Sequence, residues 1–407
     1  MGPLKASIYA VQRFRESIKE KRRNLALELY IHIPFCVRKC NYCDFLSFPA
    51  GLESIESYCR ALDEEICRTA EIIYEKQEDR NTGRISTIFV GGGTPSVLAP
   101  EQIRRLFFCL RQNFSISPDA EISMEANPGT LTREKLAACM EAGVNRLSIG
   151  LQSSDDALLK VLGRIHTWEQ FLDNYREARK TGFQNINIDL MSSLPGQTLS
   201  GYLKTLEQVT ELRPEHISSY SLILEEGTPF FDSEDIRRRL PDEAVDREMY
   251  ERTKELLHER GYERYEISNY AKEGFACRHN IGYWDGVPYL GLGLGASSYY
   301  DNARFSNEIS MKKYLEHPFI PFQERQDYYV TEIKDRIEDY MIFGLRKMSG
   351  VSLSRFAGEF GVSMEKIYGR VIRRYADMEL LVMEGDTLRL TDAGIDVSNR
   401  IFEEFLL

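Results

Sequence analysis

Two kinds of hydrophobic pattern alternate along the chain from Leu25 onward. Short runs rich in β-branched residues predict strands, and the stretches between them carry apolar residues at helical spacing. The predicted strands are Leu27–Pro34, Ser86–Gly91, Glu121–Asn127, Arg146–Gln152, Asn185–Met191 and His216–Leu224. The predicted helices are Ser54–Lys76, Pro100–Asn113, Thr132–Ala142, Trp168–Thr181 and Leu199–Leu212. Repeated strand–helix order implies parallel strands, so we expect an α/β fold, a partial (β/α)6 barrel with sites at the carboxyl ends of its strands.

The pattern is less regular downstream of the sixth strand, and it changes again after Val330. The features predicted before that point are a helix over Asp242–Arg260, a strand near Tyr265, a glycine-rich segment over Gly291–Gly295 and a linker over Pro318–Pro321. Beyond it we predict helices over Glu332–Lys347, Ser352–Phe360 and Met364–Asp377, a hairpin turning at Glu384–Thr387 and a last helix from Asp392. This order indicates a main domain over residues 25–320 and a small winged-helix-like α+β domain over residues 330–407.

The net charge bears on the role of the small domain. Its third predicted helix carries Arg370, Arg373 and Arg374, which could contact nucleic acid. The whole chain, however, has 52 Lys and Arg against 63 Asp and Glu, a net charge of −11. Such an acidic chain does not favour general nucleic-acid binding, so we expect no DNA partner and a domain that serves as a lid or packing module.

Residues 1–24 are basic and are predicted to form a helix with Leu4, Ile8, Val11, Phe14 and Ile18 on one face. We expect this helix to pack on the main domain, and peripheral contact with an anionic membrane surface is the alternative. The sequence has no run of ~20 apolar residues and no secretory signal at its amino end, which favours a cytoplasmic protein. Its 43% hydrophobic and 28% charged residues are typical of a globular chain.

Eight cysteines without a secretory signal indicate metal or redox chemistry rather than disulfides. Cys36, Cys40 and Cys43 follow the first predicted strand closely. Three thiolates on a short loop can hold three irons of a 4Fe–4S cluster and leave the fourth iron open to a small ligand. Zinc is the competing metal, but structural zinc usually takes four ligands in paired spacings, and no second pair lies nearby. His32 could be the fourth ligand, although its place within a β-run favours a position behind the site.

The Cys-x3-Cys-x2-Cys motif begins after Tyr30 and has Tyr42 before its last cysteine. It resembles the hallmark of the radical S-adenosylmethionine (SAM) superfamily. The resemblance implies that the open iron of a 4Fe–4S cluster chelates the amino and carboxylate groups of SAM. It also implies that an electron from the cluster cleaves the sulfonium to give a 5′-deoxyadenosyl radical. The cofactors would then supply the chemistry, and the protein would place them and exclude water.

Polar or glycine residues at the ends of the other predicted strands extend this resemblance. They are Gly92, Gly93 and Thr94 after the second strand, Glu125 in the third, Gln152 at the end of the fourth, Arg164 after it, and Asp189 in the fifth. The glycine segment resembles the one that contacts the methionine amino group, and its bare backbone allows close approach. A carboxylate can bind ribose hydroxyls or the amino group, and Arg164 can pair with a carboxylate. The alternative is a buried hydrogen-bond or salt-bridge network inside the barrel.

The motifs also indicate a branch of the superfamily, and two features choose within that branch. From about Leu25 to Tyr300 the motifs resemble the branch that contains oxygen-independent coproporphyrinogen III oxidase. In that oxidase a further cysteine stands two residues after the third cluster cysteine, where this chain has Phe45. The second feature resembles the His-Asn-x-x-Tyr-Trp signature of haem chaperones in the same branch. Its residues are His279, Asn280, Tyr283 and Trp284.

The resemblance to haem chaperones implies a haem site. His279 would offer an imidazole to the iron, while Tyr283 and Trp284 would supply flat apolar surface to the macrocycle. Cys277 is an alternative thiolate ligand. Without the resemblance, the same residues indicate a buried aromatic cluster around a hydrogen-bonded histidine.

We therefore expect a cytoplasmic haem chaperone with a radical SAM core, without coproporphyrinogen oxidase activity. It would bind haem, a 4Fe–4S cluster and SAM, and transfer haem to a recipient protein. The recipient, the haem ligand and the oligomeric state stay open. Two rival functions are the oxidative decarboxylation of coproporphyrinogen and a radical SAM reaction on RNA. Phe45 in place of a cysteine argues against the first rival, and the net charge of −11 argues against the second.

Overall fold

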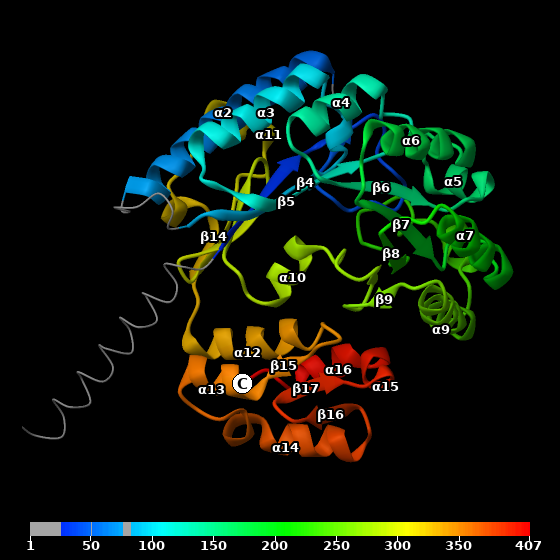
Figure 1. The fold of residues 1–407 in the computed structure, drawn as a ribbon, viewed down its shortest axis with the longest axis vertical. Coiled ribbons are helices and arrows are strands. Elements are labelled where there is room, and N and C mark those ends of the chain that lie inside the picture. Colours follow the sequence, from blue (N-terminus) through cyan, green and yellow to red (C-terminus); the bar gives the residue numbers. More distant parts are fainter. Residues whose placement is uncertain (1–25, 50, 76–82) are drawn as a thin grey trace, which may run out of the picture.

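A parallel sheet forms the centre of the main domain. The computed structural model describes residues 26–49, 51–75 and 83–407, so the predicted helix of residues 1–24 lies outside the described residues. The six predicted strands are confirmed, and they lie parallel and in chain order (Figure 1). They are β1 (Leu27–Ile33), β4 (Ile85–Gly92), β5 (Ile116–Ala126), β6 (Arg146–Gln152), β7 (Ile186–Ser192) and β8 (His216–Ser221). The predicted partial barrel is therefore the architecture of this domain.

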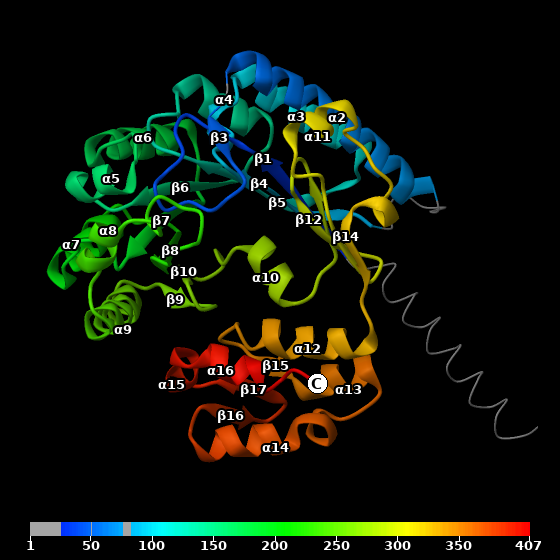
Figure 2. The same cartoon turned by 180° about the vertical axis from the view of Figure 1, so that it is seen from behind.

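Helices cover one face of this sheet (Figures 1 and 2). The five predicted between the strands are α2 (Leu52–Glu75), α3 (Pro100–Asn113), α4 (Arg133–Glu141), α6 (Trp168–Thr181) and α7 (Leu199–Glu211). Thr132, Thr167 and Thr198 cap three of these helices by accepting a hydrogen bond from a backbone N–H of the first turn. The short helix α5 (Asp156–Leu162) was not predicted, because its 7 residues are too few for a helical repeat to show.

The sheet is wider than predicted. Among the described residues the sheet has 12 strands, in the order β14-β13-β12-β11-β1-β4-β5-β6-β7-β8-β10-β9. Beside β1 lie β11 (Tyr289–Leu292, parallel), then the antiparallel β12 (Ser297–Tyr300), β13 (Ala303–Ser306) and β14 (Gln326–Val330). The other edge has β10 (Asn269–Ala271) and β9 (Glu263–Arg264). The predicted glycine-rich segment is thus a strand followed by a turn, and a Cβ on Gly291 would stand 2.2 Å from the carbonyl oxygen of Ser297.

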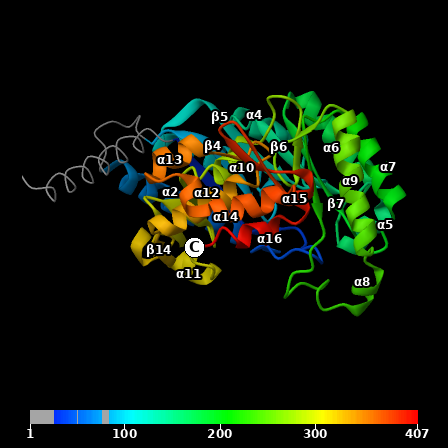
Figure 3. The same ribbon diagram turned by 90° about the horizontal axis from the view of Figure 1, so that it is seen from below.

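The carboxyl-terminal residues form a second hydrophobic cluster that includes Met341, Phe356, Tyr368 and Leu388. Its elements are α12 (Ile333–Gly344), β15 (Val351–Ser352), α13 (Leu353–Phe360), α14 (Met364–Asp377), β16 (Leu381–Glu384), β17 (Thr387–Leu390), α15 (Asp392–Asp396) and α16 (Ser398–Glu403). The strands pair as β15-β17-β16. The three helices and the hairpin match the prediction, but the single last helix is two short ones. Seen from below, this unit lies across the barrel (Figure 3).

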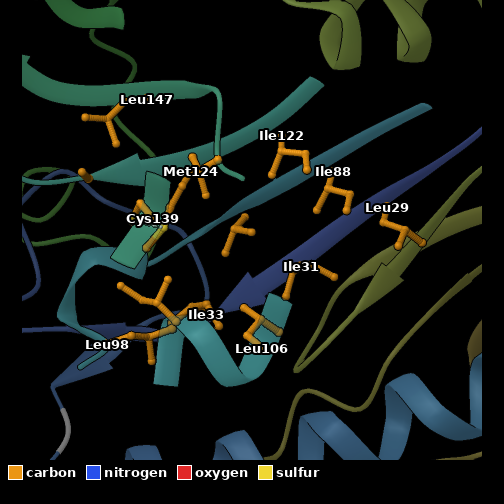
Figure 4. Close-up of a cluster of buried hydrophobic side chains, with 14 of the residues drawn as sticks. Leu29, Ile31, Ile33, Ile88, Leu98, Leu106, Ile122, Met124, Cys139 and Leu147 are labelled. Atoms are coloured by element: carbon orange, nitrogen blue, oxygen red, sulfur yellow. Dashed lines mark hydrogen bonds between the residues drawn. The ribbon is translucent and has the colours of Figure 1, made fainter. Parts of the chain in front are cut away.

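The main core lies between the sheet and the covering helices. Alternate residues of β1, namely Leu29, Ile31 and Ile33, are fully buried there. Figure 4 shows them packed with side chains of β4, β5 and β6 and with Leu98 and Leu106. Because successive side chains of a strand point to opposite faces, the residues between these apolar positions face the barrel interior. The core therefore fixes which polar side chains can meet inside the barrel.

The connection that follows β8 returns to the barrel. It contains α8 (Glu234–Arg239), the predicted helix α9 (Glu243–Glu259) and α10 (Arg278–Trp284), and α11 (Met311–Glu316) follows β13. Figures 1 and 2 show α10 between the sheet and α12, and it contacts both β4 and α12. A Cβ on Gly282 of α10 would stand 2.0 Å from a carboxylate oxygen of Glu28. Glycine therefore allows α10 to lie directly against the first strand.

Candidate functional site

The cysteine loop follows β1 at the carboxyl end of the sheet. Its short strand β2 (Phe35–Cys36) pairs with β3 (Phe48–Pro49). The ring of Phe35 packs edge-on against Tyr58 at 5.2 Å, which anchors the start of the loop. Asn41 ties its middle to α5, with its backbone N–H donating to Leu162 O (2.9 Å) and its Nδ2 to Val161 O (2.9 Å). Contacts with the barrel thus hold the loop at its start and in its middle.

The three thiols of this loop are free and partly exposed. Thr94 Oγ1 donates to Cys36 Sγ at 3.4 Å, and Arg164 Nη1 donates to Cys40 Sγ at 3.6 Å. Burial raises the pKa of Cys43. Hydrogen bonds and a guanidinium at sulfur stabilise thiolates, which is the donor chemistry that an iron–sulfur cluster needs.

Neither the cluster nor the competing zinc ion is tested by the positions of the side chains. Within residues 26–49, 51–75 and 83–407, no three His, Cys, Asp or Glu side chains are placed to hold a single metal ion. His32 lies behind the loop: its Nδ1 is 3.0 Å from Tyr30 Oη, and its Nε2 is 2.8 Å from Leu46 O. Both ring nitrogens of His32 are therefore engaged, and its position behind the site agrees with the prediction.

The predicted glycine segment lets the end of β4 pack against the cysteine loop. Gly92 has φ +108°, and a Cβ there would stand 2.6 Å from the ring of His32. A Cβ on Gly93 would stand 2.7 Å from Phe35 O. The backbone N–H of Gly92 donates to Glu125 Oε2 at 3.2 Å, so Glu125 holds the polar edge of this turn. Only glycine fits both positions, and the segment thereby places Thr94 over Cys36.

Two carboxylates line the barrel interior. Burial, with a smaller contribution from the Asp189 carboxylate, raises the pKa of Glu125 to about 8. Burial also raises the pKa of Asp189, which accepts hydrogen bonds from Ser148 Oγ (3.0 Å) and Asn187 Nδ2 (2.8 Å). Both carboxyl groups face the interior of the barrel, where they could bind the amino group or hydroxyls of a ligand.

Arg164 joins the strand ends to the cysteine loop. Its Nη2 donates to Asn127 Oδ1 (2.5 Å) and to Gly150 O (2.5 Å). Its Nε is buried and has no partner among the described residues. Gln152 stands close by with φ +71°, at a break in the pairing of β6 with β7. An unpaired guanidinium N–H next to the cysteines fits the carboxylate of a bound ligand.

Two of the predicted tyrosines lie on the walls of the site. Tyr42 packs against Phe230, with ring centroids 6.4 Å apart, and so holds the cysteine loop against the chain that follows β8. Tyr30 lies inside the barrel beside Phe89 at 6.4 Å. Asn127 is the residue that the sequence prediction missed, although it lines a pocket with Cys40, Thr94 and Arg164.

The residues predicted to bind haem lie elsewhere. His279 is 1% exposed and lies beside the start of β4, with Nδ1 2.6 Å from Thr87 Oγ1 and Nε2 2.9 Å from Tyr283 Oη. Burial lowers the pKa of His279 to about 3. Both ring nitrogens are thus engaged, so His279 as placed offers no imidazole nitrogen to iron. The structure shows the buried, hydrogen-bonded histidine that was the alternative prediction.

The other members of that motif are similarly occupied. Cys277 is fully buried, donates to Glu121 Oε1 at 3.4 Å, and has a pKa raised by burial to about 12. Asn280 is partly buried next to it on α10. The ring of Trp284 lies 4.6 Å from the guanidinium of Arg346 and 6.3 Å from the ring of Phe343. The motif therefore joins α10 to the barrel wall on one side and to the carboxyl-terminal unit on the other.

This partial barrel, with its cysteine loop at the carboxyl ends of the strands, defines a radical SAM protein. The sequence profile of the Radical SAM superfamily matches residues 30–209, and that of the HemN C-terminal domain matches residues 333–397. The structure is similar to that of coproporphyrinogen III oxidase (HemN) from Escherichia coli, with a TM-score of 0.82, 24% identity, and coverage of 94% of this chain and 91% of that one.

Sequence comparison gives the narrower family. The chain is 39% identical over 381 residues to the haem chaperone HemW of Lactococcus lactis, covering 93% of this chain and 97% of that protein. It is 37% identical over 382 residues to HemW of Bacillus subtilis, covering 93% and 98%. The chain therefore belongs to the HemW family of the radical SAM superfamily.

Proposed function

We propose that this protein is a cytoplasmic haem chaperone that holds a 4Fe–4S cluster and SAM and transfers haem to a recipient protein. The observation that carries the proposal is the 39% identity to a curated haem chaperone across 97% of that relative. Phe45, at the position where coproporphyrinogen oxidases carry a further cysteine, supports a chaperone over that enzyme. Among the described residues no helix is long and apolar enough to cross a membrane.

The cluster would be held by Cys36, Cys40 and Cys43. When bound, the cluster supplies an electron and an open iron site for SAM. Thr94 and Arg164 direct protons at two of the sulfurs, which stabilises their thiolate form. These residues would keep the loop anionic enough to bind iron.

SAM would lie in the barrel interior next to the loop. The unpaired Nε of Arg164 would bind its carboxylate, and Glu125, Gln152 and Asp189 would face its amino group and hydroxyls. Because Gly92 and Gly93 have no side chains, their backbone could approach SAM closely. Tyr30 and Tyr42 would close the side walls, excluding water from the site.

Haem is the cargo in this proposal. Its contact with His279, Tyr283 and Trp284 requires α10 to change, since His279 is hydrogen-bonded to Thr87 and Tyr283. The proposal therefore predicts that α10 moves when haem binds through His279. Hydrogen exchange of residues 278–284 with and without haem measures this movement directly, and unchanged exchange places the haem elsewhere.

The test is anaerobic reconstitution followed by haem titration. We expect about four irons and four sulfides per chain, stoichiometric haem binding seen by absorbance, and transfer of that haem to an added apo-haem protein. Zinc in place of iron, or haem that binds but never leaves, contradicts the proposal. Assay of 5′-deoxyadenosine in the same sample reports whether SAM is cleaved.

A second candidate is coproporphyrinogen oxidase activity, favoured by the fold shared with HemN at a TM-score of 0.82. Anaerobic incubation with coproporphyrinogen, SAM and a strong reductant tests it, and we expect no protoporphyrinogen. Formation of protoporphyrinogen would contradict the chaperone proposal and support oxidase activity instead.

An RNA-directed reaction is less favoured, since Arg373 and Arg374 pair with Glu365 and Glu404.

A further inference from the structure

Asn127 lies directly after β5, between the two residues that donate to cysteine sulfurs. Its Nδ2 donates to Thr94 Oγ1 at 2.7 Å, and its Oδ1 accepts from Arg164 Nη2 at 2.5 Å. Thr94 in turn donates to Cys36 Sγ, and Arg164 donates to Cys40 Sγ. A single side chain therefore bridges the partners of two cysteines that are four positions apart in the loop.

The chemistry of Arg164 determines the direction of each hydrogen bond in the series that runs from Arg164 through Asn127 and Thr94 to Cys36. A guanidinium has donors only, so the oxygen of the Asn127 amide must face Arg164. The amide nitrogen must then face Thr94 and donate to its hydroxyl oxygen. That bond leaves the hydroxyl proton of Thr94 to be donated onward, to Cys36 Sγ.

The backbone of Asn127 is fixed in place. Its N–H donates to Ser96 Oγ at 3.1 Å, and its C=O accepts from Thr130 N (3.1 Å) and Thr130 Oγ1 (2.7 Å). A Cβ on Gly150 would stand 2.9 Å from Asn127 Oδ1, so only glycine at 150 leaves room for the amide. The amide is thus pre-organised by its own loop and by the next strand.

We propose that Asn127 is a positioning residue that orients the Thr94 hydroxyl proton toward Cys36 Sγ and the Arg164 guanidinium toward Cys40 Sγ, and that it thereby raises the reduction potential of the bound cluster. The inference rests on the cluster of the proposed function. Hydrogen bonds to cluster sulfurs stabilise the reduced cluster, which carries one more negative charge. Their loss makes the cluster harder to reduce.

The substitution Asn127→Asp tests the direction of these hydrogen bonds. A carboxylate at 127 still accepts from Arg164, but it also accepts the hydroxyl proton of Thr94 and draws it away from Cys36. We expect about a tenfold lower ratio of reduced to oxidised cluster at a fixed potential, which is about 59 mV for one electron. The measurement is an anaerobic redox titration of the reconstituted protein followed by electron paramagnetic resonance.

The added charge of Asn127→Asp must be separated from the lost hydrogen bond. Thr94→Val removes the hydroxyl without adding charge, and we expect it to lower the potential in the same direction, while Thr94→Ser restores the wild-type value. If the hydroxyl carries the effect, the shift caused by Asn127→Asp becomes smaller when Thr94 is already valine. Fully additive shifts assign the effect to charge alone and overturn the proposal.

Asn174→Asp is the matched control. Asn174 binds the loop after β5 that also contains Asn127. Its Oδ1 accepts from Gly129 N (2.8 Å), and its Nδ2 donates to Leu131 O (3.3 Å). We expect its cluster potential to equal that of the wild type. Iron and sulfide are measured in every sample. An intact cluster with an unchanged potential in Asn127→Asp overturns this inference alone, whereas a wild-type chain that holds no cluster overturns the proposed function as well.

Discussion

The imidazole of His279 stacks on the ring of Phe89, with centroids 5.3 Å apart and 24° between the planes. Phe89 belongs to β4, so the histidine is part of the inner wall of the barrel. Glu28 of β1 stands 3.7 Å from His279 Nδ1 and completes the contact. The His-Asn-x-x-Tyr-Trp motif therefore contributes to stability in this state of the protein, and a test of haem binding must separate that contribution.

Replacing His279 with leucine is expected to destabilise the fold. The change leaves the hydroxyls of Thr87 and Tyr283 without this partner, at a cost of about 1–3 kcal/mol for each buried group. Denaturant unfolding followed by circular dichroism measures the loss, and His258→Leu, at an exposed position of α9, is the control. Unchanged stability together with lost haem binding would instead make His279 a haem ligand.

Stability at alkaline pH is expected to depend on Glu28. Burial, with a smaller contribution from Glu121, raises its pKa from 4.5 to about 9. The folded state thus keeps a proton that the unfolded state releases, so stability that is present below pH 4.5 is lost as the pH rises toward 9. We expect Glu28→Gln to lose less stability than wild type between about pH 7 and 9, where His279 is neutral in both states.

The control for this pH profile is Glu53→Gln, at an exposed position at the start of α2. Its unfolding free energy should follow the wild-type profile. Parallel profiles for wild type and Glu28→Gln would show that Glu28 is ionised in the folded state.

SAM binding is expected to depend on Arg164. Arg164→Lys replaces the planar fork by a single ammonium, which cannot reach a ligand carboxylate and Gly150 O together. The loss of a charge-assisted hydrogen bond, about 1.5–3 kcal/mol, weakens binding at least about tenfold. Anaerobic equilibrium dialysis with labelled SAM measures this, and Arg133→Lys on the exposed side of α4 is the control. Equal affinities would remove Arg164 from the SAM site.

Iron content is expected to depend on the cysteine loop. Cys40→Ala removes one of three thiolate ligands and should abolish stable cluster assembly, as read from iron and sulfide per chain. Cys67→Ala on α2 is the matched control, because this thiol is also free and partly exposed. A full cluster in Cys40→Ala would mean that another residue supplies the ligand.

Trp284 is expected to hold the carboxyl-terminal unit against the barrel. Trp284→Ala removes the cation–π contact with Arg346 at 4.6 Å and the packing on Phe343. We expect faster hydrogen exchange in α12, with exchange in β1 and β4 unchanged. Trp168→Ala on α6, which stacks on Phe171, is the control. Equal exchange in α12 of both variants would show that other contacts hold the unit.

The sequence predicts the barrel well because its strands are long runs with β-branched residues and its helices are long enough to show a repeat. The four short strands β11 to β14 carry no such signal, and their pairing depends on close backbone approach at Gly291. Cysteine spacing is local, so the loop could be predicted. The role of Asn127 could not, because its partners Thr94 and Arg164 lie 33 and 37 positions away.

The placement of His279 follows from a different cause. Its motif suggests an available imidazole, but the buried Thr87 hydroxyl requires a partner, and the tertiary fold supplies the histidine. Periodicity cannot reveal which strand a short helix such as α10 will contact. The long-range packing of α10 therefore decides what its histidine can do.

The position of α10 links events in two parts of the molecule. Near one end of α10, His279 is hydrogen-bonded to Thr87 of β4. Just beyond the other end, Asp285 forms an ion pair with Lys347, which follows α12 in the sequence. Drawing the histidine out toward a cargo would also pull on that ion pair. Under the proposed function, displacement of His279 by haem would therefore change the contact between α10 and the carboxyl-terminal unit, and the loaded and empty states of the protein would differ at that contact as well.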